Sequence, residues 1–187
     1  HNNKVGNFLE RKNIREILNK LEINLNQTFE LWCEDINQQV RIGSSDFRTD
    51  ERDSCLLYAG DDKTSIQGPE TIFELVDLGD QAFALKSISN GLFVQVIPPG
   101  SGDSFDPWKI SLGGNIPGAN EKFRISPDGY LYSGLMGGFI SCTANMALSG
   151  NSYAGMKSKF VLQPVDIEIA REMKERVDIS NAIIKVQ

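Results

Sequence analysis

The sequence has one histidine, His1, and three cysteines with no Cys-x-x-Cys motif. Histidine is the usual base of Ser-His-Asp and Cys-His nucleophile pairs, so the body of this chain has no base for either mechanism. Zinc clusters need closely spaced cysteines and histidines, which are also lacking. Without these groups, the sequence predicts a non-catalytic protein with no metal and no other cofactor.

Long apolar runs and clusters of basic residues are also lacking. No run approaches the roughly eighteen apolar residues that span a bilayer, so we expect no membrane insertion. The net charge is −6, and residues 28–165 carry ten basic and seventeen acidic side chains. Nucleic acid requires clustered Lys and Arg, so we expect no nucleic-acid partner. The acidic residues between Asp46 and Asp62 do not have the spacing of a calcium-binding loop.

One fourteen-residue pattern occurs three times along the chain. The three copies are FELWCEDINQQVRI from Phe29, FALKSISNGLFVQV from Phe83 and GYLYSGLMGGFISC from Gly129. Aligned without a gap, they superpose Leu31, Leu85 and Leu131, and at the turn Asn37, Gly91 and Gly137. Each copy is a predicted β-hairpin, and repetition along the chain indicates a repeated structural unit.

Two further short elements follow each hairpin. The first ends in glycine, at Gly60, Gly114 and Gly150. The second alternates apolar and polar residues around Phe73, Phe123 and Phe160, which is typical of a strand with one buried face. Each repeat therefore offers four strands, and three such units predict a closed all-β barrel.

These patterns resemble the β-trefoil superfamily, and within it the fascin-like branch, with FALKSISNGLFVQV and Glu121-Lys122-Phe123-Arg124-Ile125 as the closest matches. The resemblance covers residues 28–165 and implies repeats at about 28–80, 81–127 and 128–165. It also implies that six strands form a barrel and six form a hairpin cap. Actin bundlers, lectins, growth factors, cytokines and protease inhibitors share this fold, so function must be argued from sites.

The segments that flank the predicted trefoil are amphipathic. Residues 1–27 form a predicted N-terminal helical extension, and residues 166–187 a C-terminal helix and tail. The apolar stripes consist of Phe8, Ile14, Ile17, Leu18 and Leu21 in the first and of Ile169, Met173 and Val177 in the second. We expect these short helices to pack on each other or across the barrel end. The apolar ending, residues 179–186, favours a stalk of a longer polypeptide or a partner-binding strand.

The cysteines leave the cellular compartment open. Cys142 occupies a hairpin position filled by Ile and Val in the other repeats, so we expect it to pack as a small hydrophobic residue. Cys33 and Cys55 belong to one repeat and could form a disulfide in an oxidising compartment.

Without catalytic groups, the sequence favours a recognition domain, and a glycan is one predicted ligand. A glycan site needs an aromatic ring beside Asp or Asn oxygens. The candidate ligand-binding residues lie in or near loops that depart from the repeat, namely Tyr58, Asp103, Asp106, Trp108 and Tyr153. The alternative for Trp108 is a plug at the barrel end. No repeat has the Gln-x-Trp triplet of ricin-type lectins, and Phe73, Phe123 and Phe160 lie in that neighbourhood instead.

Two other hypotheses stand beside the glycan. In one, the trefoil is an accessory or scaffolding module of a larger protein, possibly an enzyme, and binds a protein partner. In the other, which only the fascin-like resemblance implies, it binds actin. No basic patch or duplicated trefoil supports actin binding, and no residue can be assigned to it.

Overall fold

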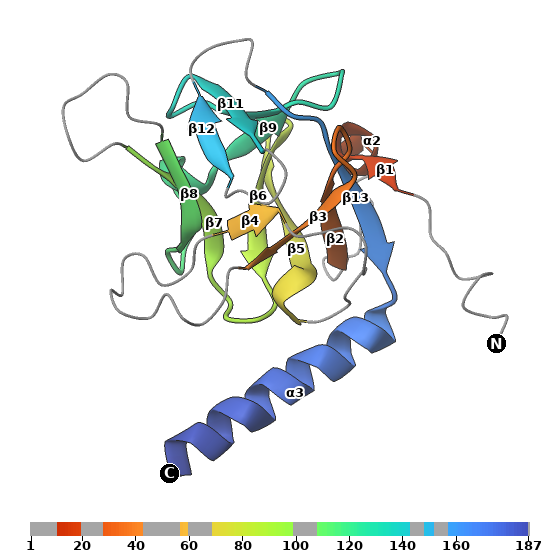
Figure 1. Cartoon of the computed structure of the whole chain (residues 1–187), viewed down its shortest axis with the longest axis vertical. Helices are drawn as coiled ribbons and strands as arrows, with labels where there is room; N and C mark the ends of the chain where they lie inside the picture. Colours follow the sequence, from red (N-terminus) through yellow and green to blue (C-terminus); the bar gives the residue numbers. More distant parts are fainter. Residues whose placement is uncertain are drawn as a thin grey trace, which may run out of the picture.

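The computed structural model describes residues 11–19, 28–42, 57–59, 69–98, 108–142, 148–151 and 157–186. Within these residues, twelve strands form three successive groups of four, as the repeats predict (Figure 1). The first group is β2 (Thr28–Cys33), β3 (Gln38–Ile42), β4 (Leu57–Ala59) and β5 (Ile72–Gly79). The second is β6 (Ala82–Ser87), β7 (Phe93–Ile97), β8 (Trp108–Gly113) and β9 (Phe123–Ile125). The third is β10 (Leu131–Ser133), β11 (Gly138–Ser141), β12 (Ser149–Asn151) and β13 (Phe160–Val165).

Six of these strands close into a barrel. Antiparallel pairing joins β13 to β2, β2 to β5, β5 to β6, β6 to β9 and β9 to β10. A single bridge between Tyr130 and Lys159 completes the circle beside β10 and β13. The β13–β2 pairing is in register over the full six residues of both strands, from Phe160 opposite Cys33 to Val165 opposite Thr28.

The remaining six strands extend the three hairpins at one end of the barrel. Hairpins β2–β3, β6–β7 and β10–β11 each pair onward, with β4, β8 and β12 respectively. The same turn position is left-handed in all three hairpins, with φ of 49° at Asn37, 73° at Gly91 and 69° at Gly137. Asn and Gly tolerate this conformation best, which explains why the repeats align there.

The barrel interior is filled by the residues that the repeats superpose. The three Phe side chains of the closing strands, Phe73, Phe123 and Phe160, are 0% exposed. Leu31, Leu85 and Leu131 are 1–2% exposed and belong to the same core cluster. Side chains that alternate toward one face of each strand therefore supply the hydrophobic stabilisation of the barrel.

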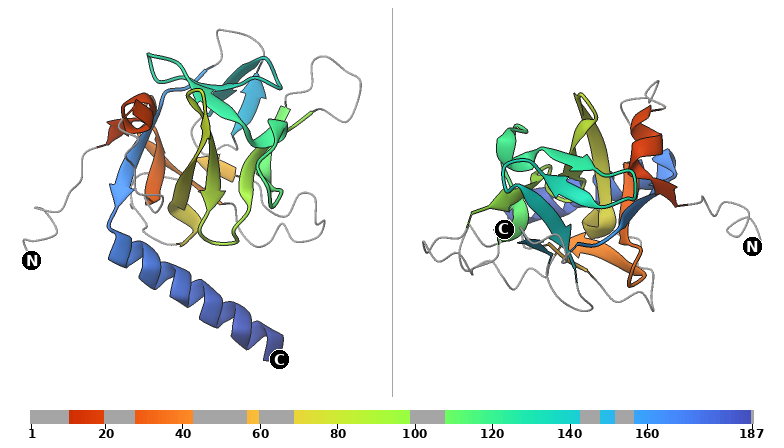
Figure 2. Two further views of the ribbon diagram at one scale, coloured as in Figure 1. Left: turned by 180° about the vertical axis from the view of Figure 1, so that it is seen from behind. Right: turned by 90° about the horizontal axis from the view of Figure 1, so that it is seen from above.

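Two helices flank the barrel, but they lie apart instead of packing on each other (Figures 1 and 2). After the two-residue strand β1 (Lys12–Asn13), which pairs with β13, helix α2 (Ile14–Asn19) inserts Ile14, Ile17 and Leu18 into the barrel core. Helix α2 therefore completes the wall beside β13. The helix expected from the apolar stripe is shorter and begins later in the structure.

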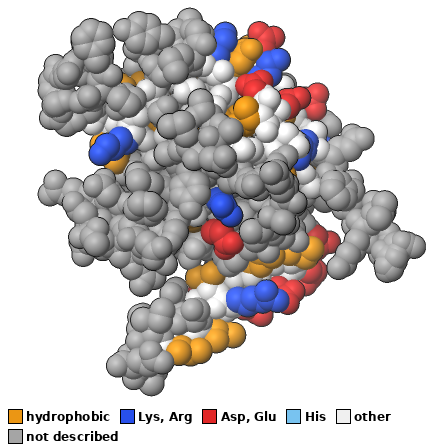
Figure 3. Space-filling view, viewed as in Figure 1, with side chains coloured by type: hydrophobic (Ala, Val, Ile, Leu, Met, Phe, Trp, Pro, Cys, Tyr) orange, Lys and Arg blue, Asp and Glu red, His pale blue; other side chains and the backbone are white. Residues whose placement is uncertain are grey.

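Helix α3 (Ile167–Val186) follows β13 and leaves the end of the barrel opposite α2. Ala170 and Met173 pack against Ile72 and Ile88 under the barrel. Its distal half projects away, with Ile179 60% and Ile183 55% exposed, and Figure 3 shows hydrophobic side chains along the helix. The strand considered for residues 179–186 is therefore wrong, because the helix continues through them. Neither described helix has the length and apolarity to cross a bilayer.

The structure pairs Cys33 with Cys142, whose Cα atoms are 7.2 Å apart. Cys142 is 7% exposed and lies in the core, as expected. The pairing considered between Cys33 and Cys55 is not formed, because the barrel brings the first and third hairpins together at the inward position of Cys33. Cys55 itself lies outside the described residues.

Gly150 provides a test of packing between the second and third repeats. A Cβ at Gly150 would lie 2.8 Å from Cβ of Trp108 and would also overlap Sδ of Met136. Overpacking of this kind costs about 1–3 kcal/mol. We expect Gly150→Ala to lower the free energy of unfolding by that amount in urea denaturation. Gly134→Ala is the control, because a Cβ there meets nothing within 4 Å. Equal stability of the two variants would contradict the packing described.

Candidate binding face on the third hairpin

The structure brings together a different set of residues from the one that the sequence singled out. Asp103, Asp106 and Tyr153 lie outside the described residues, and Tyr58 is placed only by its backbone, opposite Arg41. Trp108 is half-buried at the start of β8 and packs against the core. Its position fits the plug alternative better than a free sugar platform.

The three hairpins present equivalent residues on their outer faces. Adjacent strands place Trp32 opposite Gln39, Lys86 opposite Phe93 and Tyr132 opposite Phe139. These pairs occupy the same two positions of the repeated pattern. One position earlier on the same face, the repeats carry Glu30, Ala84 and Tyr130. The outer face is thus where the three copies differ.

In the third repeat this outer face is aromatic. Phe139 contacts both neighbouring tyrosines edge-on, with ring centroids 5.4 Å from Tyr132 and 6.3 Å from Tyr130. All three rings are half-buried, and edge-to-face packing holds them in fixed orientations. We call Tyr130, Tyr132 and Phe139 the aromatic face.

Cations border the aromatic face on two sides. The Lys157 ammonium lies 4.2 Å from the Tyr130 ring centroid and 5.4 Å from that of Phe139, and Lys159 lies 5.7 Å from Tyr130. On the other side, Arg124 stands opposite Tyr132 on the adjacent strand. No cation in the described part of the chain lies over Tyr132, whereas Lys157 lies over both of the other rings.

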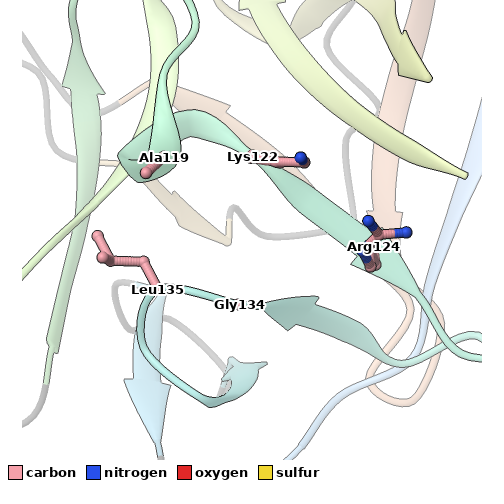
Figure 4. A pocket seen from close by; sticks show the side chains of 5 residues that line it. All are labelled: Ala119, Lys122, Arg124, Gly134 and Leu135. Atoms are coloured by element: carbon pink, nitrogen blue, oxygen red, sulfur yellow. The ribbon is translucent and has the colours of Figure 1, made fainter. Parts of the chain in front are cut away.

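A shallow hollow of about 240 Å³ adjoins the aromatic face (Figure 4). Lys122 and Arg124 border it along β9, and Gly134 and Leu135 border it from the turn of the third hairpin. Ala119, in the short helix η3 (Ala119–Glu121), completes the lining. Lys122, Arg124 and Leu135 are exposed, so polar and apolar groups are both available to a ligand.

In the first repeat, Arg11 covers Trp32, the residue equivalent to Tyr132. Trp32 is 3% exposed, and the Arg11 guanidinium stacks 3.8 Å from its ring centroid. Arg11 also donates a hydrogen bond of 2.7 Å to Oδ1 of Asn37. Arg11, directly before β1, therefore covers this face with a cation on an aromatic ring.

In the second repeat the equivalent ring is buried. Phe93 is 5% exposed, and the Lys86 ammonium lies 6.0 Å from its centroid. Among the three hairpins as described, the third alone leaves its aromatic rings half-exposed. The described residues also contain no group of three His, Cys, Asp or Glu side chains that could hold a metal. Aromatic stacking and cationic hydrogen bonding are therefore the chemistry that this face offers.

The first repeat also holds a buried carboxylate, Glu30, which is 3% exposed. Burial raises the pKa of Glu30, because its charged form loses hydration. A 2.9 Å hydrogen bond from Nε2 of Gln39 opposes this shift, as do the nearby Trp32 indole and the Arg11 charge. The Trp32 indole opposes the shift most, and because its buried Nε1 has no partner that meets hydrogen-bond geometry, this effect is electrostatic.

No protein-family model matches the chain, and no curated protein matches it in sequence. Solved structures do match its shape. It is similar to a designed threefold-symmetric protein, ThreeFoil, at 17% identity and a TM-score of 0.54, over 72% of this chain and 97% of that one. A second match, the BEL β-trefoil, has 15% identity and a TM-score of 0.54, over 76% and 96% of the two chains.

A third similar structure is 1,3Gal43A, an exo-β-1,3-galactanase from Clostridium thermocellum. The match has 17% identity and a TM-score of 0.55, and it covers 74% of this chain but 30% of the galactanase. These similarities show the fold. The chain is a β-trefoil with a C-terminal helix, as the repeats predicted.

The raised pKa of Glu30 makes the stability of the fold depend on pH. Because its folded pKa is raised above the unfolded value, ionisation destabilises the fold, and stability is lost as the pH rises from the unfolded value of 4.5 through the folded one. The amide oxygen of Glu30→Gln can still accept the Gln39 hydrogen bond. We expect this variant to unfold at higher urea than the parent at pH 7, with the difference shrinking toward pH 4.

The control for Glu30→Gln is Glu34→Gln, because Glu34 is an exposed residue in the turn of the same hairpin. That variant is expected to match the parent across the pH range. A Glu30→Gln protein that is less stable than the parent at pH 7 would show that the ionised carboxylate stabilises the fold, contrary to the burial argument.

Proposed function

We propose that this β-trefoil is a non-catalytic glycan-recognition module, and that the aromatic face of the third repeat is its binding surface. The observation that carries the proposal is the difference between repeats. On the outer hairpin faces, the first repeat covers Trp32 with Arg11 and the second buries Phe93, whereas the third leaves three rings half-exposed. Exposed aromatic side chains next to polar groups are typical of binding surfaces.

A sugar ring suits this surface for a physical reason. Its apolar C–H face stacks on a flat aromatic ring, while its hydroxyl groups hydrogen-bond at the edge. Tyr132 supplies the open ring, and its phenol can donate or accept. The shallow hollow beside it is open to solvent, which suits a ligand that is itself polar.

The same domain fits the role of an accessory module in a larger protein. The galactanase to which it is similar contains a region of this shape within a chain of which the match covers 30%. The aromatic face lies at the hairpin end of the barrel, and α3 leaves from the opposite end (Figures 1 and 2). A protein attached through α3 would therefore leave the binding face unobstructed.

Replacing Tyr132 tests the proposed surface. On a glycan array, the parent protein is expected to bind at least one glycan, and Tyr132→Ala is expected to weaken that binding about tenfold or more, since 1.4 kcal/mol of lost stacking corresponds to tenfold. Tyr132→Phe keeps the ring and is expected to retain most of the affinity. Thermal unfolding of each variant checks that the fold is intact.

Trp108→Ala separates this surface from the site that the sequence predicted. The proposal expects this variant to bind once corrected for any loss of stability. Loss of binding in folded Trp108→Ala, with Tyr132→Ala unaffected, would transfer the site to the loop before β8. No binding of the parent to any glycan would refute glycan recognition.

Membership of the fascin-like branch, and the actin binding that it implies, stays a prediction from sequence resemblance. The four basic residues nearest the aromatic face lie in or shortly before β9 and β13 of one trefoil, and a single trefoil engages one filament. Co-sedimentation with filamentous actin at low salt tests this alternative, and a protein left in the supernatant would remove it.

A further inference from the structure

The end of the second repeat and the whole third repeat differ in charge from the rest of the trefoil. Lys122 to Val165 contain four basic residues and one acidic residue, whereas residues 28–121 contain six basic and sixteen acidic ones. The four basic residues are Lys122, Arg124, Lys157 and Lys159. All four lie beside the aromatic face or the hollow next to it, so four of the ten basic residues of an acidic domain lie where the rings are exposed.

The charges of Lys122 and Arg124 are not neutralised by neighbouring carboxylates. In the part of the chain that the structure describes, neither residue forms an ion pair. Arg124 donates one hydrogen bond, from Nη1 to the main-chain oxygen of Asp80, which leaves further donors on its guanidinium. Glu121, the acidic residue next to Lys122, is 7% exposed and accepts a 3.1 Å hydrogen bond from the Gly118 N–H.

The side near Lys157 and Lys159 is less favourable for an anion. Both ammonium groups lie over aromatic rings, and the carboxylate of Asp35 accepts a 2.7 Å hydrogen bond from the main-chain N–H of Lys159. An incoming negative charge would meet a carboxylate there. The hollow between Lys122, Arg124 and the third hairpin is therefore the position where a ligand anion is stabilised most.

From this arrangement we infer that the ligand is an acidic saccharide, with a sugar ring on Tyr132 and its carboxylate or sulfate against Arg124 and Lys122. The inference rests on the proposed glycan function. Arg124 stands directly opposite Tyr132 on the neighbouring strand, a spacing of about 4.5–5.5 Å between Cβ atoms. One monosaccharide can span that distance. A guanidinium binds carboxylate or sulfate through two parallel hydrogen bonds.

The overall charge argues against a nucleic acid at the same surface. Rings and cations also suit single-stranded nucleic acid, but such ligands follow a groove over several nucleotides. Residues 28–121, with ten more acidic than basic residues, would repel a polyanion beyond the third hairpin. A short acidic oligosaccharide avoids this repulsion.

The test compares two matched probes by titration calorimetry, a tetramer of galacturonic acid and the same tetramer with its carboxyl groups reduced to alcohols. We expect the acidic tetramer to bind at least about tenfold more tightly in 20 mM salt, which is ~1.4 kcal/mol. This advantage is expected to fall in 500 mM salt, because exposed charges are screened. A sulfated galactose tetramer distinguishes sulfate from carboxylate as the preferred anion.

Two double variants with the same change in net charge identify the residues. Lys122→Gln with Arg124→Gln is expected to abolish the preference for acidic probes, because the acidic tetramer loses much more affinity than the neutral one. Lys109→Gln with Lys174→Gln removes two exposed cations elsewhere and is expected to keep the preference. Equal loss in both double variants would overturn the site, because only overall charge would then matter.

The remaining outcomes separate the inference from the proposed function. Equal binding of acidic and neutral tetramers overturns the acidic ligand but leaves glycan recognition standing. If no saccharide binds on the array or in the titration, the proposed function fails and the inference fails with it. Tight binding of a single-stranded hexanucleotide, with none of the saccharides bound, overturns both in favour of a nucleic acid.

Discussion

The pairing of β2 with β13 is the constraint on which the rest of the structure depends. It joins the first and last strands of the trefoil along six residues of each, and so converts a row of hairpins into a closed barrel. Closure places Phe73, Phe123 and Phe160 inside and removes exposed sheet edges from the barrel. It also brings the third hairpin beside the first, which sets Cys142 against Cys33 and lets α2 fill the wall next to β13. Local strand propensity alone would produce none of these contacts.

The two faces of each hairpin have different roles, because side chains alternate between the two faces of a β-strand. Inward residues must fit a shared core, so the three repeats agree at them, as Leu31, Leu85 and Leu131 do. Outward residues carry no such requirement. Here the repeats carry Trp32, Lys86 and Tyr132 at one position, and each has acquired a different environment from its surroundings. The threefold architecture thus supplies three structurally equivalent surfaces on one stable barrel.

The sequence revealed the fold because its three copies share buried positions and turn glycines, which no other architecture explains as simply. The sequence did not point to the aromatic face, because its candidate residues lie mainly in loops that break the repeat, such as the one that contains Asp103 and Asp106. Tyr130, Tyr132 and Phe139 lie within the repeat and differ from their counterparts only on the outer face. The only sign of these residues in the sequence is that the three copies differ at their outward-facing positions. Their contrast with the other two repeats depends on Arg11, which covers Trp32, and on the burial of Phe93, which are tertiary facts. The C-terminal helix was predicted, and only the strand considered for residues 179–186 was wrong. Ile-rich sequence favours strand locally, whereas a helix already begun at Ile167 extends at little cost.

Arg11, stacked on Trp32 and bonded to Asn37, has a consequence for valency. A trefoil with three open hairpin faces would hold three ligands and cross-link the polymers that carry them. Here Arg11 occupies the position that a ligand would take on the first repeat, and the Phe93 ring of the second repeat is buried. In the described hairpins the proposed binding surface therefore occurs once, so under the proposed function one domain would hold one ligand chain.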